Sequence, residues 1–169
     1  MKSILESERL ILREFNLGDA AFIIELLNSP GWLEFIGDRK IKTIKDAENY
    51  LLQGPLKSYA QHGYGLYLVE LKAGKVALGI CGLLKRDFLT DPDIGFAFLP
   101  EHSGQSYAFE AAKAMMDHGY AVLKLNKIVA ITEPHNVRSI RLLNKLGLHF
   151  EKPVRISNEN NELLLFTEG

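Results

Sequence analysis

Three apolar runs that follow one another in the middle of the chain constrain its fold most. They cover residues 64–71, 76–84 and 93–99, and residues 72–75, Lys-Ala-Gly-Lys, join the first two as a hairpin turn. Pro100 ends the third run. Consecutive strands with short connections predict an antiparallel centre for the sheet, which argues against a doubly wound parallel sheet.

Helical spacing of apolar residues flanks this centre on both sides. Asn16 and Thr43 each precede an acidic residue by three positions, which indicates capped helix starts, and residues 29–31 end the first helix. The further predicted elements are helices over 107–123 and 136–146, and strands over 9–13, 127–131, 148–151 and 162–167. The order predicts a mixed α/β (α+β) fold with helices on both faces of the sheet.

Length and composition predict one globular domain over residues 1–169. The 169 residues are 47% apolar and 24% charged, close to the globular average, and no linker or repeat divides them. The single cysteine, Cys81, lies in an apolar run and is predicted to be a buried core thiol. The five histidines show no metal-binding spacing, so no metal site is expected.

Charge and hydropathy exclude several classes of partner. The net charge is −1, so the strongly basic footprint of a nucleic-acid-binding domain is absent. No apolar stretch approaches the roughly 18 residues that a membrane span needs, so no membrane partner is expected. The N-terminal residues turn acidic before an apolar signal region could form, and the expected location is cytoplasmic.

Residues 93–108 carry the chemistry that can be inferred from the sequence. A strand there runs into a short polar loop containing Ser103, Gly104 and Ser106, and the loop opens a helix. Backbone N–H groups at a helix N-terminus favour phosphate or pyrophosphate. The segment lacks the P-loop and dinucleotide-fold signatures. An ordinary connection between a strand and a helix remains the alternative interpretation.

Three segments, in order, resemble the GNAT N-acetyltransferases of the RimJ/RimL type. Residues 92–111, PDIGFAFLPEHSGQSYAFEA, resemble motif A of that family, and residues 8–13, ERLILR, resemble its usual start. Residues 136–139, NVRS, followed by Gly147, resemble its last conserved segment. The resemblance covers residues 8–151 and implies the GNAT fold, in which two splayed parallel strands, here 93–99 and 127–131, form a V-shaped cleft for acetyl-CoA.

The resemblance also implies which residues hold the co-substrate. The main chain at Phe98 and Leu99 would pair with the pantetheine arm, and Asn136 would bind near the second helix. The residues implied for the pyrophosphate loop are Ser103, Gly104, Gln105, Ser106, Tyr107 and Ala108. Ser103 and Ser106 depart from the family motif, which has Arg, Gln or Trp at the first of these positions and Gly at the second. If the loop requires a positive φ at Ser106, the serine is strained.

Acetyl transfer needs a neutral amine near the thioester carbonyl and a proton for the leaving thiolate. An α-amino group has a pKa of about 8 and a lysine about 10.4, so an N-terminus needs less help from a base. Many GNAT enzymes supply the proton from a tyrosine, whose place is taken here by Leu143. The resemblance to RimL implies Ser139 instead, although Ser139 also fits as the third residue of a helix capped by Asn136.

Two carboxylates are candidates for the base. Asp93 begins one of the splayed strands and Glu133 ends the other, although Asp93 also fits as a turn residue and Glu133 as a strand exit. The RimL-like carboxylate after the last helix falls near Asn158, which cannot act as a base, and Glu159 is adjacent to it.

The acceptor is the least determined part of the prediction. Trp32 and Phe35 lie in the linker 30–37, which walls the acceptor site in this family, or else they cap the core. The predicted acceptor is a primary amine, foremost a protein N-terminal α-amine. The alternatives are a small amine (a polyamine, an amino acid or an aminoglycoside) or a CoA-binding domain without catalysis. A carboxylate-lined cleft would favour the small amine. The family also allows a homodimer.

Overall fold

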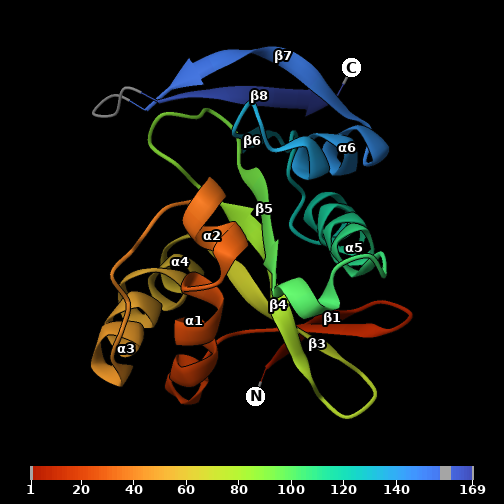
Figure 1. The fold of residues 1–169 in the computed structure, drawn as a ribbon. Helices are drawn as coiled ribbons and strands as arrows, with labels where there is room; N and C mark the ends of the chain where they lie inside the picture. Colours follow the sequence, from red (N-terminus) through yellow and green to blue (C-terminus); the bar gives the residue numbers. More distant parts are fainter. Residues whose placement is uncertain (1, 157–160, 169) are drawn as a thin grey trace.

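A five-stranded antiparallel sheet forms the centre of the molecule. The computed structural model describes residues 2–156 and 161–168. The strands lie in sequence order, β1-β2-β3-β4-β5 (Figure 1). They are β1 (Ser3–Glu6), β2 (Leu10–Arg13), β3 (Leu66–Leu71), β4 (Ala77–Leu84) and β5 (Asp93–Phe98). The predicted antiparallel centre is confirmed, and β1 adds an edge strand that the sequence patterns did not indicate.

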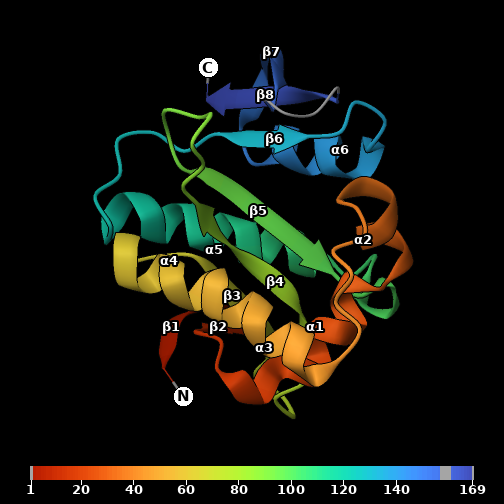
Figure 2. The ribbon, with the colours of Figure 1, turned by 90° about the vertical axis from the view of Figure 1, so that its left-hand side faces the viewer.

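A second sheet meets the first at the start of β5. Its order is β6-β8-β7, with β6 (Ala130–Thr132), β7 (Leu148–Arg155) and β8 (Glu162–Glu168). β5 and the segment leading into β6 are parallel, and they pair through Ile94 N–H to the Val129 carbonyl (2.8 Å) and Val129 N–H to the Pro92 carbonyl (3.0 Å). Beyond this junction the two strands diverge (Figure 2). The predicted splayed pair is therefore confirmed.

Helices cover both faces of the first sheet. The described helices are α1 (Ala20–Leu27), α2 (Pro30–Phe35), α3 (Ile44–Gln53), α4 (Pro55–His62), α5 (Tyr107–Ala121) and α6 (Val137–Lys145), of which α6 packs on β6 and β7 of the second sheet. Ala112 and Met115 of α5 pack in one apolar cluster with the buried thiol of Cys81, as predicted. Ile23 of α1 and Leu51 of α3 pack in a second cluster on the other face. No helix among the described residues is long and apolar enough to cross a bilayer.

Two of the helices begin where the sequence predicts a turn or no element at all. The segment 30–37 is predicted as a linker, but residues 30–35 form α2, so this prediction is wrong. Pro30 occupies the first turn of α2, and Pro55 occupies the first turn of α4. Proline is tolerated there because those N–H groups have no partner within the helix. The predicted capping boxes at Asn16 and Thr43 are confirmed, although Asn16 caps a 3-10 turn that precedes α1.

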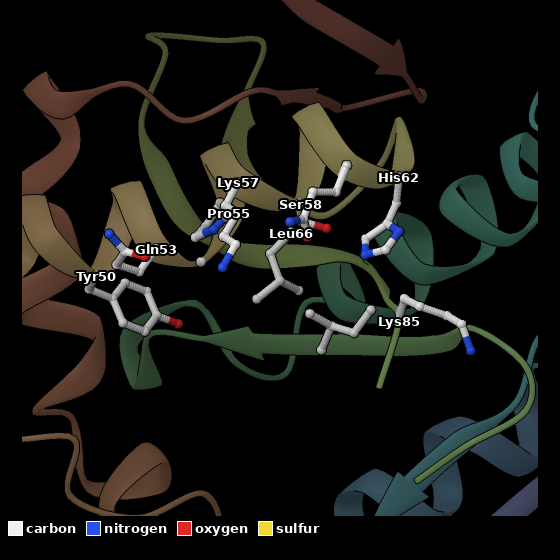
Figure 3. A pocket seen from close by; sticks show the side chains of 11 residues that line it. Tyr50, Gln53, Pro55, Lys57, Ser58, His62, Leu66 and Lys85 are labelled. Carbon is white, nitrogen blue, oxygen red and sulfur yellow. The ribbon is translucent and has the colours of Figure 1, made fainter. Parts of the chain in front are cut away.

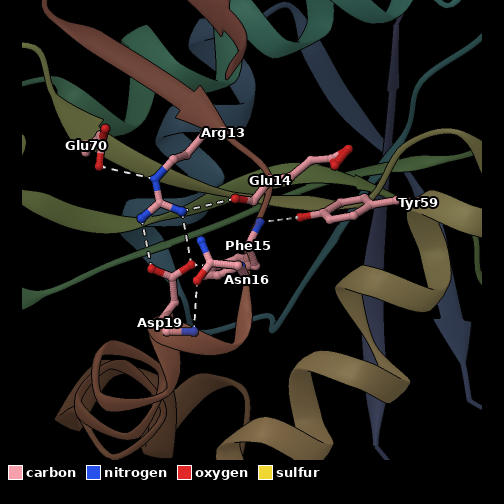
Figure 4. Close-up of polar contacts among 8 residues, drawn as sticks. Arg13, Glu14, Phe15, Asn16, Asp19, Tyr59 and Glu70 are labelled. Carbon is pink, nitrogen blue, oxygen red and sulfur yellow. Dashed lines mark hydrogen bonds and ion pairs between the residues drawn. The ribbon is translucent and has the colours of Figure 1, made fainter. Parts of the chain in front are cut away.

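Arg13 fixes the first helical layer to the sheet. Arg13 is 7% exposed, and its guanidinium donates to both carboxylate oxygens of Asp19 (3.0 and 2.8 Å) and to Glu70 (3.4 Å) (Figure 4). The hydroxyl of Tyr59 accepts a hydrogen bond from Phe15 N–H (3.2 Å), which ties α4 to the same connection. These bonds join β2, β3, α4 and the turn before α1, and so they position the helices that cover one side of the cleft.

Candidate active site

The loop between β5 and α5 has the backbone shape of an anion-binding cradle. Gly104 has a φ of +79°, a conformation that side chains rarely adopt, and Ser103 Oγ donates to the Pro100 carbonyl (2.8 Å). The first helical hydrogen bond is donated by Glu110 N–H to the Ser106 carbonyl (3.1 Å). The N–H groups that precede it on α5 lack partners within the helix, as at every helix start. They are available to a phosphate group at the positive end of the helix dipole.

Ser106 has the positive φ at which a serine is expected to be strained. Its φ is +64° and its ψ is +17°, in the left-handed region, and its side chain caps no described residue. For an L-residue, the free energy of this conformation is roughly 1–2 kcal/mol higher than that of the right-handed helical conformation. The loop therefore keeps its turn although the family's glycine is replaced by serine.

Arg9 and Glu110 hold this loop from the side. The main-chain N–H and the Nε of Arg9 donate to the carboxylate of Glu110 (2.8 and 2.7 Å), and Ser7 Oγ donates to it as well (2.7 Å). Arg9 Nη2 also donates to the Gln105 carbonyl (3.0 Å), and its guanidinium lies 4.4 Å above the Tyr107 ring. Burial would raise the pKa of Glu110, but these hydrogen bonds lower it below its ordinary value.

The two strand residues assigned to the pantetheine arm differ in what their main chains can offer. Leu99 N–H donates to the Leu78 carbonyl (3.0 Å) and its own carbonyl accepts from His102 N–H (3.0 Å), so both groups are already used. Ile94 N–H points toward the β6 side of the strand. Because the direction of main-chain groups alternates along a strand, the N–H of Phe98 points to the same open side. Of the two residues, Phe98 is the better main-chain partner.

Asn136 and Ser139 lie on the other arm of the V, at the start of α6. Asn136 Oδ1 accepts a hydrogen bond from Ser139 N–H (3.2 Å), which confirms that Asn136 caps the helix. The half-buried hydroxyl of Ser139 has no hydrogen-bond partner among the described residues. Lys145 Nζ lies 4.2 Å above the Phe109 ring, and this contact links α6 to the first turn of α5.

Asp93 lies at the junction where the two strands still pair. It is 1% exposed, and Arg86 Nε donates to its Oδ1 (2.9 Å). Burial raises the pKa of Asp93, while Arg86 opposes this shift. Asp93 is paired with Leu84 in the β4–β5 register, so both side chains lie on the sheet face opposite α5.

The second candidate base is distant from the first. Glu133 follows β6 directly and is half-buried, and its carbonyl accepts from Asn136 N–H (3.1 Å). Asp93 pairs with Val129, and Val129 and Glu133 are separated by about 13 Å of extended strand. The two carboxylates therefore cannot both serve the same amine. Asn158 and Glu159 lie outside the described residues.

The two aromatic residues assigned to the acceptor wall lie in different surroundings. Trp32 is 6% exposed and packs in the apolar cluster of α1 and α3, so it supports α2 instead of forming an open wall. Its indole N–H is the one buried side-chain donor without a partner in the described part of the chain. The Phe35 ring lies 5.4 Å from the His135 ring, so α2 reaches the loop before α6 at the mouth of the V (Figure 2).

A cavity of about 310 Å³ lies between α3, α4 and the strands, on the sheet face of Asp93 (Figure 3). A Cβ built on Gly95 of β5 would lie 3.4 Å from Leu84 and 3.7 Å from Leu66, and both leucines line the cavity. The other lining residues are Tyr50, Gln53, Gly54, Pro55, Lys57, Ser58, Gln61, His62 and Lys85. The sequence patterns gave this cavity no signal, because five of its eleven lining residues come from α4, which was not predicted.

Comparison with known proteins agrees with this arrangement. Residues 9–149 match the family described as Acetyltransferase (GNAT) domain. The chain is 32% identical to the uncharacterized protein YkkB of Bacillus subtilis over 161 residues, which cover 94% of this chain and 92% of that protein. It is 28% identical over 153 residues to the uncharacterized N-acetyltransferase p20 of Bacillus licheniformis, covering 89% and 85% of the two chains.

Solved structures show the same fold. An acetyltransferase from Agrobacterium tumefaciens superposes with a TM-score of 0.82 at 21% identity and covers 100% of this chain and 96% of its own. RimL, a ribosomal L7/L12 α-N-protein acetyltransferase in complex with coenzyme A, gives 0.82 at 15% identity, with 99% and 97% covered. The chain belongs to the GNAT family of N-acetyltransferases.

Proposed function

We propose that this enzyme transfers the acetyl group of acetyl-CoA to a primary amine, and that the preferred amine is a protein N-terminal α-amine. The observation that supports this most is the V between β5 and β6, with a strained, braced cradle at its wide end. Left-handed backbone at Gly104 and Ser106 turns successive N–H groups toward one side, which suits the pyrophosphate of CoA.

Different residues of this chain would bind different parts of acetyl-CoA. The amides of residues 104–108 would hold the pyrophosphate, and Phe98 would offer its main chain to the pantetheine. Asn136 and Ser139 would face the co-substrate from the other arm of the V. Acetyl-CoA supplies an activated acetyl thioester, so no metal or redox group is required for the transfer itself.

Asp93 and Ser139 carry the proton transfers in this proposal. Attack by the amine forms the C–N bond and breaks the C–S bond. Asp93, on the cavity side of the strand junction, accepts a proton from the attacking amine, directly or through a water. Its raised pKa brings it nearer to the working pH of a general base. The free Ser139 hydroxyl donates a proton to the sulfur that leaves and regains one from solvent, while Asp93 releases its proton to solvent. Glu133 is the alternative base.

Transfer to a small amine is the second candidate function. The spermidine N(1)-acetyltransferase of Escherichia coli is 40% identical to this chain, but over 52 residues that cover only 31% of it. Solved structures of both classes superpose on nearly the whole chain, RimL on 99% of it and a spermidine N-acetyltransferase chimera on 94%. We place the protein N-terminus first because an α-amino group, with a pKa of about 8, needs less help from a base than an aliphatic amine.

The first experiment is calorimetric titration of the protein with acetyl-CoA, with adenosine diphosphate as the comparison. Micromolar binding that requires the pantetheine arm supports the proposed cleft. Mass spectrometry of a panel of peptides and small amines, incubated with acetyl-CoA, then identifies the acceptor. Failure to bind acetyl-CoA at millimolar concentration would overturn the proposal and leave a domain without catalysis.

A further inference from the structure

We infer that the cavity beside β5 binds an acidic group of the acceptor, so that the enzyme prefers anionic over cationic primary amines. The inference rests on the proposed function and adds the chemical class of its substrate. Among peptide N-termini, it selects those that carry an acidic side chain at the second residue.

Two leucine side chains connect the cavity to the strand on which transfer would occur. A side chain at Gly95 of β5 would touch Leu66 and Leu84, and both leucines line the cavity. No described residue of β5 lines the cavity itself, so these two leucines lie between it and the main chain of β5. Asp93, our proposed base, lies two residues before Gly95 and so faces the same side of the sheet.

The lining of the cavity offers donors and positive charge but no carboxylate. Lys57 and His62 both extend from α4 at its edge, and Tyr50 directs its hydroxyl into it (Figure 3). Lys57 has no carboxylate partner within 4 Å among residues 2–156 and 161–168, so its ammonium is available to a ligand. An ammonium and an imidazole N–H are good partners for a carboxylate.

Other cations surround the same space. Lys85 contributes its aliphatic stem to the lining, while its ammonium donates to the carbonyls of Leu89 and Thr90 (3.1 and 3.3 Å). Burial raises the pKa of Tyr50, and Arg39 and Arg86 lie close enough to oppose this shift. Because Asp93 is already paired with Arg86, the charged groups named around the cavity carry a net positive charge. Such a field disfavours a second ammonium on the acceptor.

The size of the cavity sets a limit on the acceptor. At about 310 Å³ it lies near the lower end of ligand pockets, which span roughly 300–1,000 Å³. It therefore accommodates one acidic side chain with its peptide group. The extended chain of a polyamine gains nothing from this site, because its further ammonium groups would meet Lys57 and His62.

Peptides that differ only at the second residue test the inference. We would measure kcat/KM, by release of free CoA thiol, for peptides that begin Ser-Glu, Ser-Gln and Ser-Lys, with spermidine as a cationic small amine. The expected order is Glu, then Gln, then Lys, with roughly tenfold between the first two, as expected for one charge-assisted hydrogen bond. Equal values, or a preference for the lysine peptide or spermidine, would overturn the inference.

Charge reversal at Lys57 supplies the matched test. Lys57→Glu changes an exposed side chain and so preserves the fold, and it is expected to invert the preference between the Glu and Lys peptides. Lys45→Glu, on the exposed face of α3 and outside the cavity lining, makes the same charge change and should leave the preference intact. An unchanged preference in Lys57→Glu contradicts the assigned site.

A binding measurement separates this inference from the proposed function. The imidazole NMR signals of His62, assigned with His62→Gln, are followed while the CoA-bound protein is titrated with the Glu or the Lys peptide. If no peptide is acetylated but the Glu peptide alone shifts these signals, the acidic site stands and transfer to N-termini fails. If peptides are acetylated but neither shifts them, transfer stands and the acidic site fails.

Discussion

The two sides of the cleft are built by different means. The cofactor side is a backbone structure, in which Gly104 and Ser106 hold left-handed conformations and Arg9 braces the loop through Glu110 and Gln105. The proposed acceptor side is a side-chain structure, in which α4 presents exposed residues such as Lys57 over a cavity of about 310 Å³. Main-chain N–H groups are available from any residue that lets the loop keep its shape, as Ser106 does, and exposed side chains can be exchanged without loss of the fold. Specificity for the acceptor can thus change while co-substrate binding is preserved.

Asp93 gives the sharpest test of the acceptor side, because it is the one buried carboxylate at the junction. Asp93→Asn should lower kcat by about 10²–10⁴-fold, the range for a general base, with little change in the Kd for acetyl-CoA. Steady-state rates and calorimetry measure the two quantities. Glu133→Gln is the control, and a larger loss of kcat in that variant would transfer the role of base to Glu133.

The same variant changes how stability depends on pH. The pKa of Asp93 is raised in the folded protein, so the folded state holds its proton more tightly than the unfolded state does. The stabilisation from this group is therefore complete below the ordinary aspartate pKa of about 3.8, and it is lost as pH rises through the raised pKa. Asp93→Asn removes this contribution, so its melting temperature should fall less between pH 4 and neutral pH. If the melting temperatures of the wild type and Asp93→Asn changed equally with pH, the raised pKa of Asp93 would be contradicted.

Arg9 tests the bracing of the cofactor side. Arg9→Ala leaves the Glu110 carboxylate with fewer donors and releases Gln105, which should weaken acetyl-CoA binding by about 1–2 kcal/mol, or roughly 5–30-fold in Kd. The rate at saturating acetyl-CoA should change much less. Arg155→Ala is the control, because it removes another arginine side chain, one that forms an exposed ion pair with Glu162 far from the loop. This variant should leave the Kd for acetyl-CoA unchanged.

Ser139 distinguishes a helix-capping role from a catalytic one. Ser139→Ala keeps the main-chain N–H that donates to Asn136 Oδ1, so the helix cap and the melting temperature should not change. The loss of the hydroxyl should lower kcat by roughly tenfold, below the 10²–10⁴-fold range of strong acid–base groups, because a thiolate is a good leaving group. Unchanged kcat, measured at saturating peptide, would leave Ser139 with its structural role alone.

Local patterns predicted the parts of the fold that depend on local chemistry. The capping boxes at Asn16 and Thr43 and the strand-loop-helix segment at 93–108 are encoded by neighbouring residues, and the structure contains all of them. Pro30 was misleading, because proline both ends helices and begins them. Nothing in the local sequence distinguishes the two uses, so α2 was predicted as a linker.

Long-range contacts could not be predicted from the sequence. Arg9 and Glu110 are separated by 101 positions, and neither lies in a pattern that indicates its partner. Trp32 was assigned to the acceptor wall because of its position, whereas burial against α1 gives it a place in the core. The acceptor cavity depends on how α4 packs over β3 and β4, which is a property of tertiary structure.

Ser106 provides the smallest expected effect and tests the cofactor side directly. Ser106→Gly relieves a left-handed conformation disfavoured by roughly 1–2 kcal/mol, while the added freedom of the unfolded chain opposes it by about 0.5–1 kcal/mol. The net gain of about 0.5–1 kcal/mol should raise the melting temperature by about 1–4 °C in a chain of this size. Ser103→Gly is the matched control, because Ser103 has a φ of −75° and donates to the Pro100 carbonyl, so glycine there should only destabilise. If both glycine variants lower the melting temperature, the strain at Ser106 is offset by contacts of its own, and the serine supports the cradle that it was expected to weaken.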